Sequence, residues 1–195
     1  TEFLPYQSNK GNISEEEATL MYVGILVDTN RFKTRTGGRT FEAAAYLKNL
    51  GVDPIMAENL LKENFDEFEE KTSIMKYARK YKDNMIIAAV DNHKAMNRTL
   101  MSQVADSLLN IKNVEASFVI GNIEDGRVAV SARSKGIINV QVIMENMHGG
   151  GHFTMAALQR ENSSVQAINE ELMQVIDAYL NEKEEDDKDE SNSTK

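Results

Sequence analysis

Two apolar segments joined by a short polar turn constrain the fold of this chain more than any other feature. VEASFVIGNI (114–123) and GRVAVSARS (126–134) have the length and β-branched content of strands, and the EDG between them is a typical hairpin turn. Two strands joined so closely must pair antiparallel. The second half of the chain is therefore predicted to contain a core sheet.

Further strands and helices are predicted around this hairpin. MIIAAV (85–90) is an apolar run typical of a buried strand. Helices with an apolar face are expected over 99–111, 139–147 and 163–180. The predicted fold is α/β of the α+β kind, with a mixed, mostly antiparallel sheet flanked by helices.

The first half of the chain begins with a helix signal. Ser14 and Glu17 form a capping-box signature, and the helix is expected to reach about Gly24. A short apolar, strand-like stretch then ends at Asp28. A second helix is predicted over 40–51, where the terminal glycine is typical of a helix end.

Residues 53–83 are predicted to form one long helix that joins two domains. Pro54 lies near its start, acids follow it, and no glycine interrupts the segment. His93, further on, is interpreted as a solvated loop histidine.

The negative charge of the chain is concentrated at its C-terminal end. NEKEEDDKDESNSTK (181–195) carries a net charge of −4 out of the chain's −9. This segment is too polar to pack, so it is predicted to be a disordered acidic tail. The rest is only mildly acidic, which is compatible with a local site that binds an anion.

Other features of the composition concern the setting of the protein. The chain has no cysteine, which excludes disulfides and thiol nucleophiles and fits a reducing cytoplasm. No apolar run approaches the ~18 residues that span a membrane. The opening TEFLPYQ (1–7) is interpreted as a helix end that runs into a loop, so we expect the chain to be a piece of something longer.

The most unusual segment is NMHGGGHFTMAA (146–157), in which three glycines run into one of three histidines. Glycine triplets weaken helices and strands alike. In one interpretation, Gly149, Gly150 and Gly151 let backbone N–H groups approach a phosphate, with His152 adding a donor. In the other, the segment is a turn followed by a structural histidine.

A second polar segment, SARSKGIIN (131–139), is predicted to lie near the glycines. Strand alternation places Ser131 and Arg133, and with them Lys135, on one face. An arginine before a glycine-containing turn suits a phosphate, although a solvated strand end would have the same pattern. One helix could bridge the two segments, so they can converge.

Together these segments carry a resemblance. SARSKG…NVQVIMENMHGGGH resembles the signature of the DHHA1 domain, which accompanies DHH phosphoesterase domains and uses these motifs to line a substrate pocket. MYVGILVDTNRF…RTGGRTFEAAAYLKNLGVD resembles the end of a DHH domain. The likeness covers about residues 14–180 and is greatest to membrane-anchored cyclic-di-AMP phosphodiesterases of Gram-positive bacteria. Related enzymes often have a fourth glycine where this chain has His148, which we expect to cap the preceding helix.

The resemblance implies a domain plan and a function. The expected parts are the end of a DHH domain (1–52), a helical linker (53–83), a DHHA1 substrate-binding domain (84–180) and the acidic tail (181–195). The implied enzyme is a metal-dependent phosphodiesterase that hydrolyses cyclic-di-AMP to linear pApA. This chain would supply its nucleotide-binding half, at the cytoplasmic face of the membrane.

The resemblance also implies roles for single residues. The implied substrate-binding residues are Ser131, Arg133, Gly149, Gly150, Gly151 and His152. Asp28 is implied to be one ligand of a two-metal site that usually holds Mn²⁺, or else a strand-end cap, and Arg35 and Arg39 could flank that site. The Asp-His-His motif of the family is absent from these residues. No complete catalytic site is therefore expected in this chain, and the chain alone is predicted to be inactive.

Other functions remain open from the sequence. The site motifs also suit a DHH-family oligoribonuclease, a nanoRNase or a RecJ-like exonuclease, or a non-catalytic module that binds nucleotide or RNA. The acidic composition without a basic stripe argues against an extended nucleic-acid partner. Residues 1–50 are expected to be poorly ordered or to pair with a second copy as a homodimer.

Overall fold

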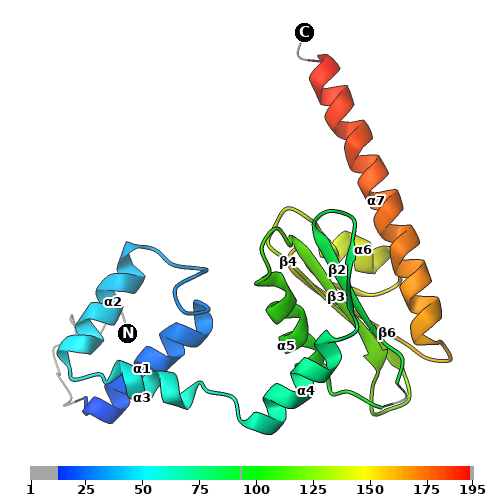
Figure 1. Cartoon of the computed structure of the whole chain (residues 1–195). Helices are drawn as coiled ribbons and strands as arrows, with labels where there is room; N and C mark the ends of the chain where they lie inside the picture. The colour runs from blue at the N-terminus through cyan, green and yellow to red at the C-terminus, as the bar shows by residue number, and fades with distance from the viewer. Residues whose placement is uncertain (1–12, 93, 194–195) are drawn as a thin grey trace. The chain divides into compact units, whose positions relative to one another are not determined.

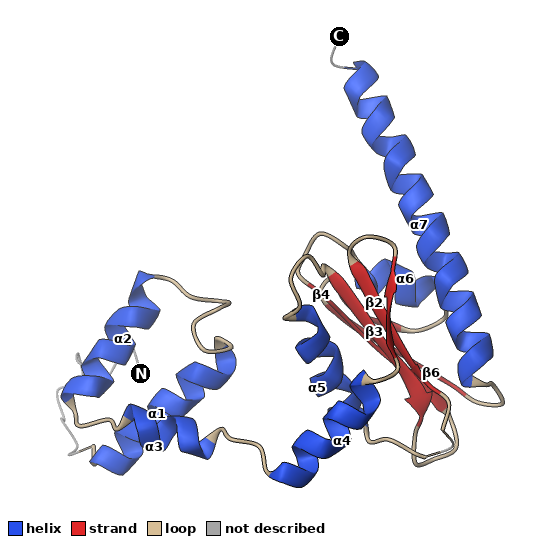
Figure 2. Cartoon of the chain, viewed as in Figure 1, coloured by secondary structure: helices blue, strands red, loops and turns tan. Residues whose placement is uncertain are grey.

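The computed structural model describes residues 13–92 and 94–193. It divides into two compact units, residues 1–64 and 65–195, which are treated separately below. The predictions for the opening segment 1–7 and for His93 lie outside the described residues. Figures 1 and 2 show helices alone in the described part of the first unit, and a sheet with helices in the second.

The first unit contains α1 (Glu15–Asp28), α2 (Gly38–Asn49) and α3 (Pro54–Leu60) around a small core of Ala18, Leu47 and Val52. The predicted capping box is confirmed, because the Ser14 hydroxyl accepts from the Glu17 N–H while the Glu17 carboxylate accepts from the Ser14 N–H. Poor order of residues 1–50 was one expectation, and the described part of that segment contains the helices α1 and α2.

The prediction of a strand-like stretch that ends at Asp28 is wrong. Helix α1 does not stop near Gly24, and Asp28 is its last residue. A lone strand would leave its backbone groups unpaired, whereas continuing an existing helix pairs each of them at little cost. The helix ends at Thr29, whose hydroxyl donates to the Ile25 carbonyl.

The single helix predicted over 53–83 is also wrong. The chain forms α3, then α4 (Phe65–Met75), and then the strand β1 (Ala78–Tyr81). The boundary between the two units lies after Asn64, inside this segment. The sequence ARKY has no strand signature of its own, and it is extended because it pairs along β2.

The second unit is built on one mixed sheet of six strands in the order β1-β2-β3-β4-β6-β5. The β2–β3 pair is parallel, and the other neighbouring pairs are antiparallel. The remaining strands are β2 (Met85–Val90), β3 (Ala116–Asn122), β4 (Val128–Ser134), β5 (Gly150–His152) and β6 (Met155–Arg160). The predicted hairpin is β3–β4, and the predicted strand 85–90 is β2, so both are confirmed.

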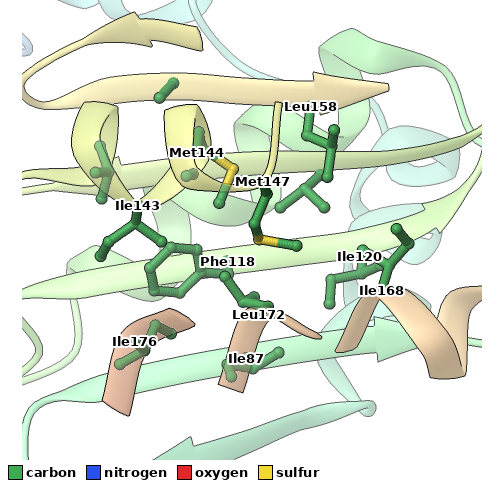
Figure 3. Close-up of a cluster of buried hydrophobic side chains, with 14 of the residues drawn as sticks. Ile87, Phe118, Ile120, Ile143, Met144, Met147, Leu158, Ile168, Leu172 and Ile176 are labelled. Atoms are coloured by element: carbon green, nitrogen blue, oxygen red, sulfur yellow. The ribbon is translucent and has the colours of Figure 1, made fainter. Parts of the chain in front are cut away.

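Helices cover both faces of this sheet. On one face, α6 (Val140–Asn146) and α7 (Val165–Ser193) pack on a core that contains Phe118, Met144 and Met147 (Figure 3). On the other face, α5 (Arg98–Leu109) and the end of α4 cover β2, β3 and part of β4. The predicted helices at 99–111, 139–147 and 163–180 are confirmed, and strand alternation decides which residue faces which layer.

Two features of the second unit were not predicted. The glycine run and the segment after it form a hairpin, β5–β6, although MAALQR has little β-branched content. Helix α7 continues to Ser193, where an unstructured acidic tail was predicted (Figure 1). Glu and Lys are good helix formers, and no glycine or proline interrupts the segment, so the helix propagates from its packed half.

Candidate functional site

Ser131 and Arg133 share the face of β4 that is covered by α5. The sheet residues Val128, Val130 and Ala132 point to the opposite core, so the predicted alternation is confirmed. Lys135, predicted on the same face, lies beyond the end of β4. Both site side chains therefore emerge where α5 lies beside the strand.

The Arg133 guanidinium is held from three directions. Its Nε donates to Oδ1 of Asp106 on α5 at 3.1 Å, and its Nη1 donates to the Ala132 carbonyl at 3.0 Å and to the Ser131 hydroxyl at 3.3 Å. Within the described part of the chain, Nη2 has no hydrogen-bond partner. The side chain is 15% exposed, so it offers this free edge from a fixed position.

Two opposing effects act on the ionisation of Asp106. Burial raises the pKa of this carboxyl, and the Arg133 guanidinium, through its charge and its hydrogen bond, acts in the lowering direction. Burial has the larger effect, so the pKa of Asp106 is raised overall. The side chain is nevertheless 60% exposed, at the open edge of the α5–β4 contact.

The register of the sheet brings the glycine run beside these residues. Ser131 pairs with Ala157, which pairs with Gly150 on its other side. Arg133 is in register with Met155 and, through it, with His152. Directly opposite residues of antiparallel strands project to one face, so two rows cross the sheet.

We call the surface formed by these two rows the shelf: Ser131, Ala157 and Gly150 in one row, and Arg133, Met155 and His152 in the other. Ala157, Met155 and His152 are exposed, so the shelf is open to solvent beyond α5. Arg133 and His152 lie two strands apart, about 10 Å at ordinary strand spacing. The shelf thus has a cation at one side and an imidazole at the other, with Met155 between them and the small residues Ala157 and Gly150 in the neighbouring row.

The three glycines differ in what surrounds them. A Cβ at Gly149 would lie 2.5 Å from the Ala157 carbonyl oxygen, and one at Gly151 would lie 2.4 Å from the Cα of Ala156. Gly151 also has φ +149°, where L residues are rare. A Cβ at Gly150 would meet nothing within 4 Å. Two glycines therefore permit close packing, and only Gly150 leaves open space on the shelf.

The turn that leads into the glycines is fixed by backbone hydrogen bonds. The Gly149 N–H donates to the Met144 carbonyl and the His148 N–H to the Glu145 carbonyl, which is the Schellman arrangement at the end of α6. His148 is exposed and occupies the left-handed position at φ 63°. It ends the preceding helix, as predicted, through its backbone.

Arg160 supports the same turn from β6. Its Nη2 donates to the Met147 carbonyl at 2.6 Å, and its guanidinium pairs with Glu171 of α7. The hydrogen bonds that Arg160 donates to Glu171 raise the pKa of Arg160, which keeps its charge. The carbonyl at the end of α6 is thereby tied to the next strand and to α7.

The remaining predicted residues belong to the first unit. Asp28 lies 3.6 Å from the Arg35 guanidinium, both side chains being about two-thirds exposed, and Arg39 lies in the first turn of α2. Across residues 13–92 and 94–193, no three His, Asp or Glu side chains are grouped closely enough to hold a metal ion. Asp28 is thus a single carboxylate beside a guanidinium, and the described residues do not complete a metal centre around it.

A family model described as the DHHA1 domain matches residues 82–182, which contain the whole shelf. The chain belongs to the DHHA1 domain family. Over 92% of its length it is 42% identical to the cyclic-di-AMP phosphodiesterase GdpP of Bacillus subtilis and 40% identical to the cyclic-di-AMP phosphodiesterase PdeA of Listeria monocytogenes. It spans only 28% and 27% of the length of these two relatives.

A solved structure shares the fold. An exopolyphosphatase-related protein from Bacteroides fragilis superposes with a TM-score of 0.74 at 19% identity, over 86% of this chain and 51% of that one. No helix among the described residues is long and apolar enough to cross a membrane.

Three residues that contact the predicted site residues or the turn before the glycines were not predicted from the sequence: Ser102, Asp106 and Arg160. The first two are four residues apart and so share one face of α5, where the Ser102 hydroxyl lies 3.3 Å from that of Ser131. A polar pair at this spacing in an otherwise amphipathic helix was the available signal. No such signal existed for Arg160, because the strand that contains it was not predicted.

Proposed function

We propose that this chain is the nucleotide-binding part of a phosphodiesterase that hydrolyses cyclic-di-AMP to linear pApA. The observation that supports this most is the shelf, where a fixed guanidinium and an imidazole flank an open floor in a DHHA1 domain. The named activity of the curated relatives supports the choice of substrate. Because the chain spans under a third of those relatives, the activity itself is assigned to the longer protein.

The shelf residues have distinct roles in this proposal. The free Nη2 of Arg133 pairs with a phosphate oxygen, and Ser131 adds a hydroxyl beside it. His152 donates to a second phosphate or to a base. Strand β5 is a sheet edge, so alternate N–H groups of its backbone face outward, where an anion can accept from them.

The chemical step is assigned to groups beyond those that the structure describes. The resemblance implies two Mn²⁺ ions, which would supply a hydroxide and neutralise charge on the phosphate. Asp28 is proposed as one ligand, but the described residues do not bring further ligands to it. The DHH origin of residues 1–52 and membrane anchoring of the longer protein are parts of the same proposal.

A paired measurement of binding and hydrolysis tests this function. We expect the 195-residue chain to bind cyclic-di-AMP in calorimetry and to leave it intact during incubation with Mn²⁺. Arg133→Ala is expected to weaken binding at least tenfold, as for loss of a charge-assisted hydrogen bond. Preference for linear oligonucleotides of two to five residues would favour the oligoribonuclease function, and robust hydrolysis by the chain alone would contradict the assignment of the metal site.

A further inference from the structure

We propose that Asp106 is a positioning residue, which orients Arg133 so that its Nη2 edge is presented to a phosphate on the shelf. This inference rests on the proposed function, since it assigns a role in binding the same ligand. Asp106 itself lies on α5, outside both sequence motifs, and it is not proposed to touch the nucleotide.

The geometry of the guanidinium supports this role. An arginine side chain has many rotamers, and two of the three hydrogen bonds that Arg133 donates go to its own strand, at residues 131 and 132. Among the described residues, only the bond from Nε to Oδ1 of Asp106 reaches another element, and it fixes the direction of the planar group. With Nε and Nη1 occupied, the donors left for a ligand are those of Nη2, which lies next to Nε at the end of the guanidinium.

The placement of Asp106 suits a role in positioning Arg133 better than a role in stabilising the fold. Surface ion pairs contribute little to folding, and the Asp106 carboxylate is 60% exposed. Among the described residues, Asp106 is the carboxylate that pairs with the Arg133 guanidinium. Loss of the carboxylate should therefore leave the fold intact and release the guanidinium.

A comparison of Asp106→Asn with Asp106→Ala in the whole chain tests the positioning role of Asp106. Asparagine keeps an acceptor for Nε, so cyclic-di-AMP binding should stay within about threefold of wild type, whereas alanine should weaken it about tenfold. In an Arg133→Lys background, which lacks Nε, Asp106→Ala should cost nothing further, as expected for a residue that acts through Arg133. Asp125→Ala, which removes another carboxylate paired with an arginine, is the matched control and should bind as wild type.

A second readout does not need the nucleotide. The Nε–H signal of Arg133 in a ¹⁵N spectrum, assigned by its loss in Arg133→Lys, should shift in Asp106→Ala and persist in Asp106→Asn. An unchanged signal in Asp106→Ala would overturn the contact, and a shifted signal with unchanged affinity would overturn the positioning role. If wild type itself binds no cyclic-di-AMP, the proposed function fails, while this spectrum still decides whether Asp106 orients Arg133.

Discussion

At the scale of single residues, the three glycines of the triplet differ in what surrounds them. Gly149 and Gly151 lie so close to β6 that any Cβ would overlap its backbone, whereas Gly150 lies over open space. A glycine run in a sequence suggests a ligand cradle, but packing alone explains two of its members. The feature that points to a ligand is the one glycine without a packing reason.

This difference gives a prediction for alanine substitutions. Gly149→Ala and Gly151→Ala should each lower the free energy of unfolding by about 1–3 kcal/mol, as overpacking does. Gly150→Ala should change it by less than about 1 kcal/mol. Urea unfolding of the three variants measures this, and equal losses at all three positions would contradict the distinction.

His148 gives a second prediction at this scale. Its left-handed backbone costs a non-glycine residue roughly 1–2 kcal/mol. His148→Gly should therefore raise the free energy of unfolding by about 0.5–1 kcal/mol. His148→Ala, which keeps the Cβ, is the control and should give no gain. A loss of stability in the glycine variant would show that the imidazole has a role of its own.

At the scale of elements, α7 is fastened to β1 by a polar cluster. The Tyr81 hydroxyl lies 2.7 Å from Oδ1 of Asp177 and 3.1 Å from the Met173 carbonyl, and the Lys82 ammonium lies 2.7 Å from the same Oδ1. Burial, reinforced by Asp177, raises the pKa of Tyr81 from 10.0 to about 12. The hydrogen bond from Lys82, with that from Tyr81, lowers the pKa of Asp177.

The directions of these two pKa shifts predict how the stabilisation by this polar cluster depends on pH. Because the pKa of Tyr81 is raised, its contribution is complete below pH 10 and is lost as pH rises through about 12. Because the pKa of Asp177 is lowered, its contribution is present above 3.8 and is lost as pH falls through the folded value.

A comparison with Tyr81→Phe isolates this cluster. At neutral pH the variant should be about 1 kcal/mol less stable, for the lost hydrogen bonds. That difference should shrink between pH 10 and 12 and again as pH falls below 3.8, as measured by denaturant unfolding at each pH. A difference that stays constant across the whole range would contradict the assigned ionisations.

The elements also show what the sequence could and could not predict. The strands 85–90, 116–122 and 128–134 were recognisable because each carries its own apolar pattern. The strands β1 and β5 are extended only because they pair with a neighbour, and their own residues, ARKY and GGH, give no strand signal. The helix α1 was predicted too short because its apolar end has the composition of a strand.

At the scale of the whole molecule, the same limit applies to the site. The sequence predicted that SARS and GGGH would converge, and the sheet register places Ser131 and Arg133 in line with Gly150 and His152. It did not predict Asp106, because that contact depends on how α5 lies across β4. The net charge of the chain was equally uninformative about the site, because an acidic chain can still present a guanidinium on the shelf.

The position of the bound nucleotide tests the central claim most directly. In a titration of the ¹⁵N-labelled chain with cyclic-di-AMP, we predict that the largest shifts fall on the backbone amides of 150–152 and on the Nε–H of Arg133. Signals on the opposite face of the sheet, such as those of Tyr77 and Asn169, which line a pocket of about 330 Å³, should stay in place. Shifts confined to that pocket, with the shelf unmoved, would contradict the account.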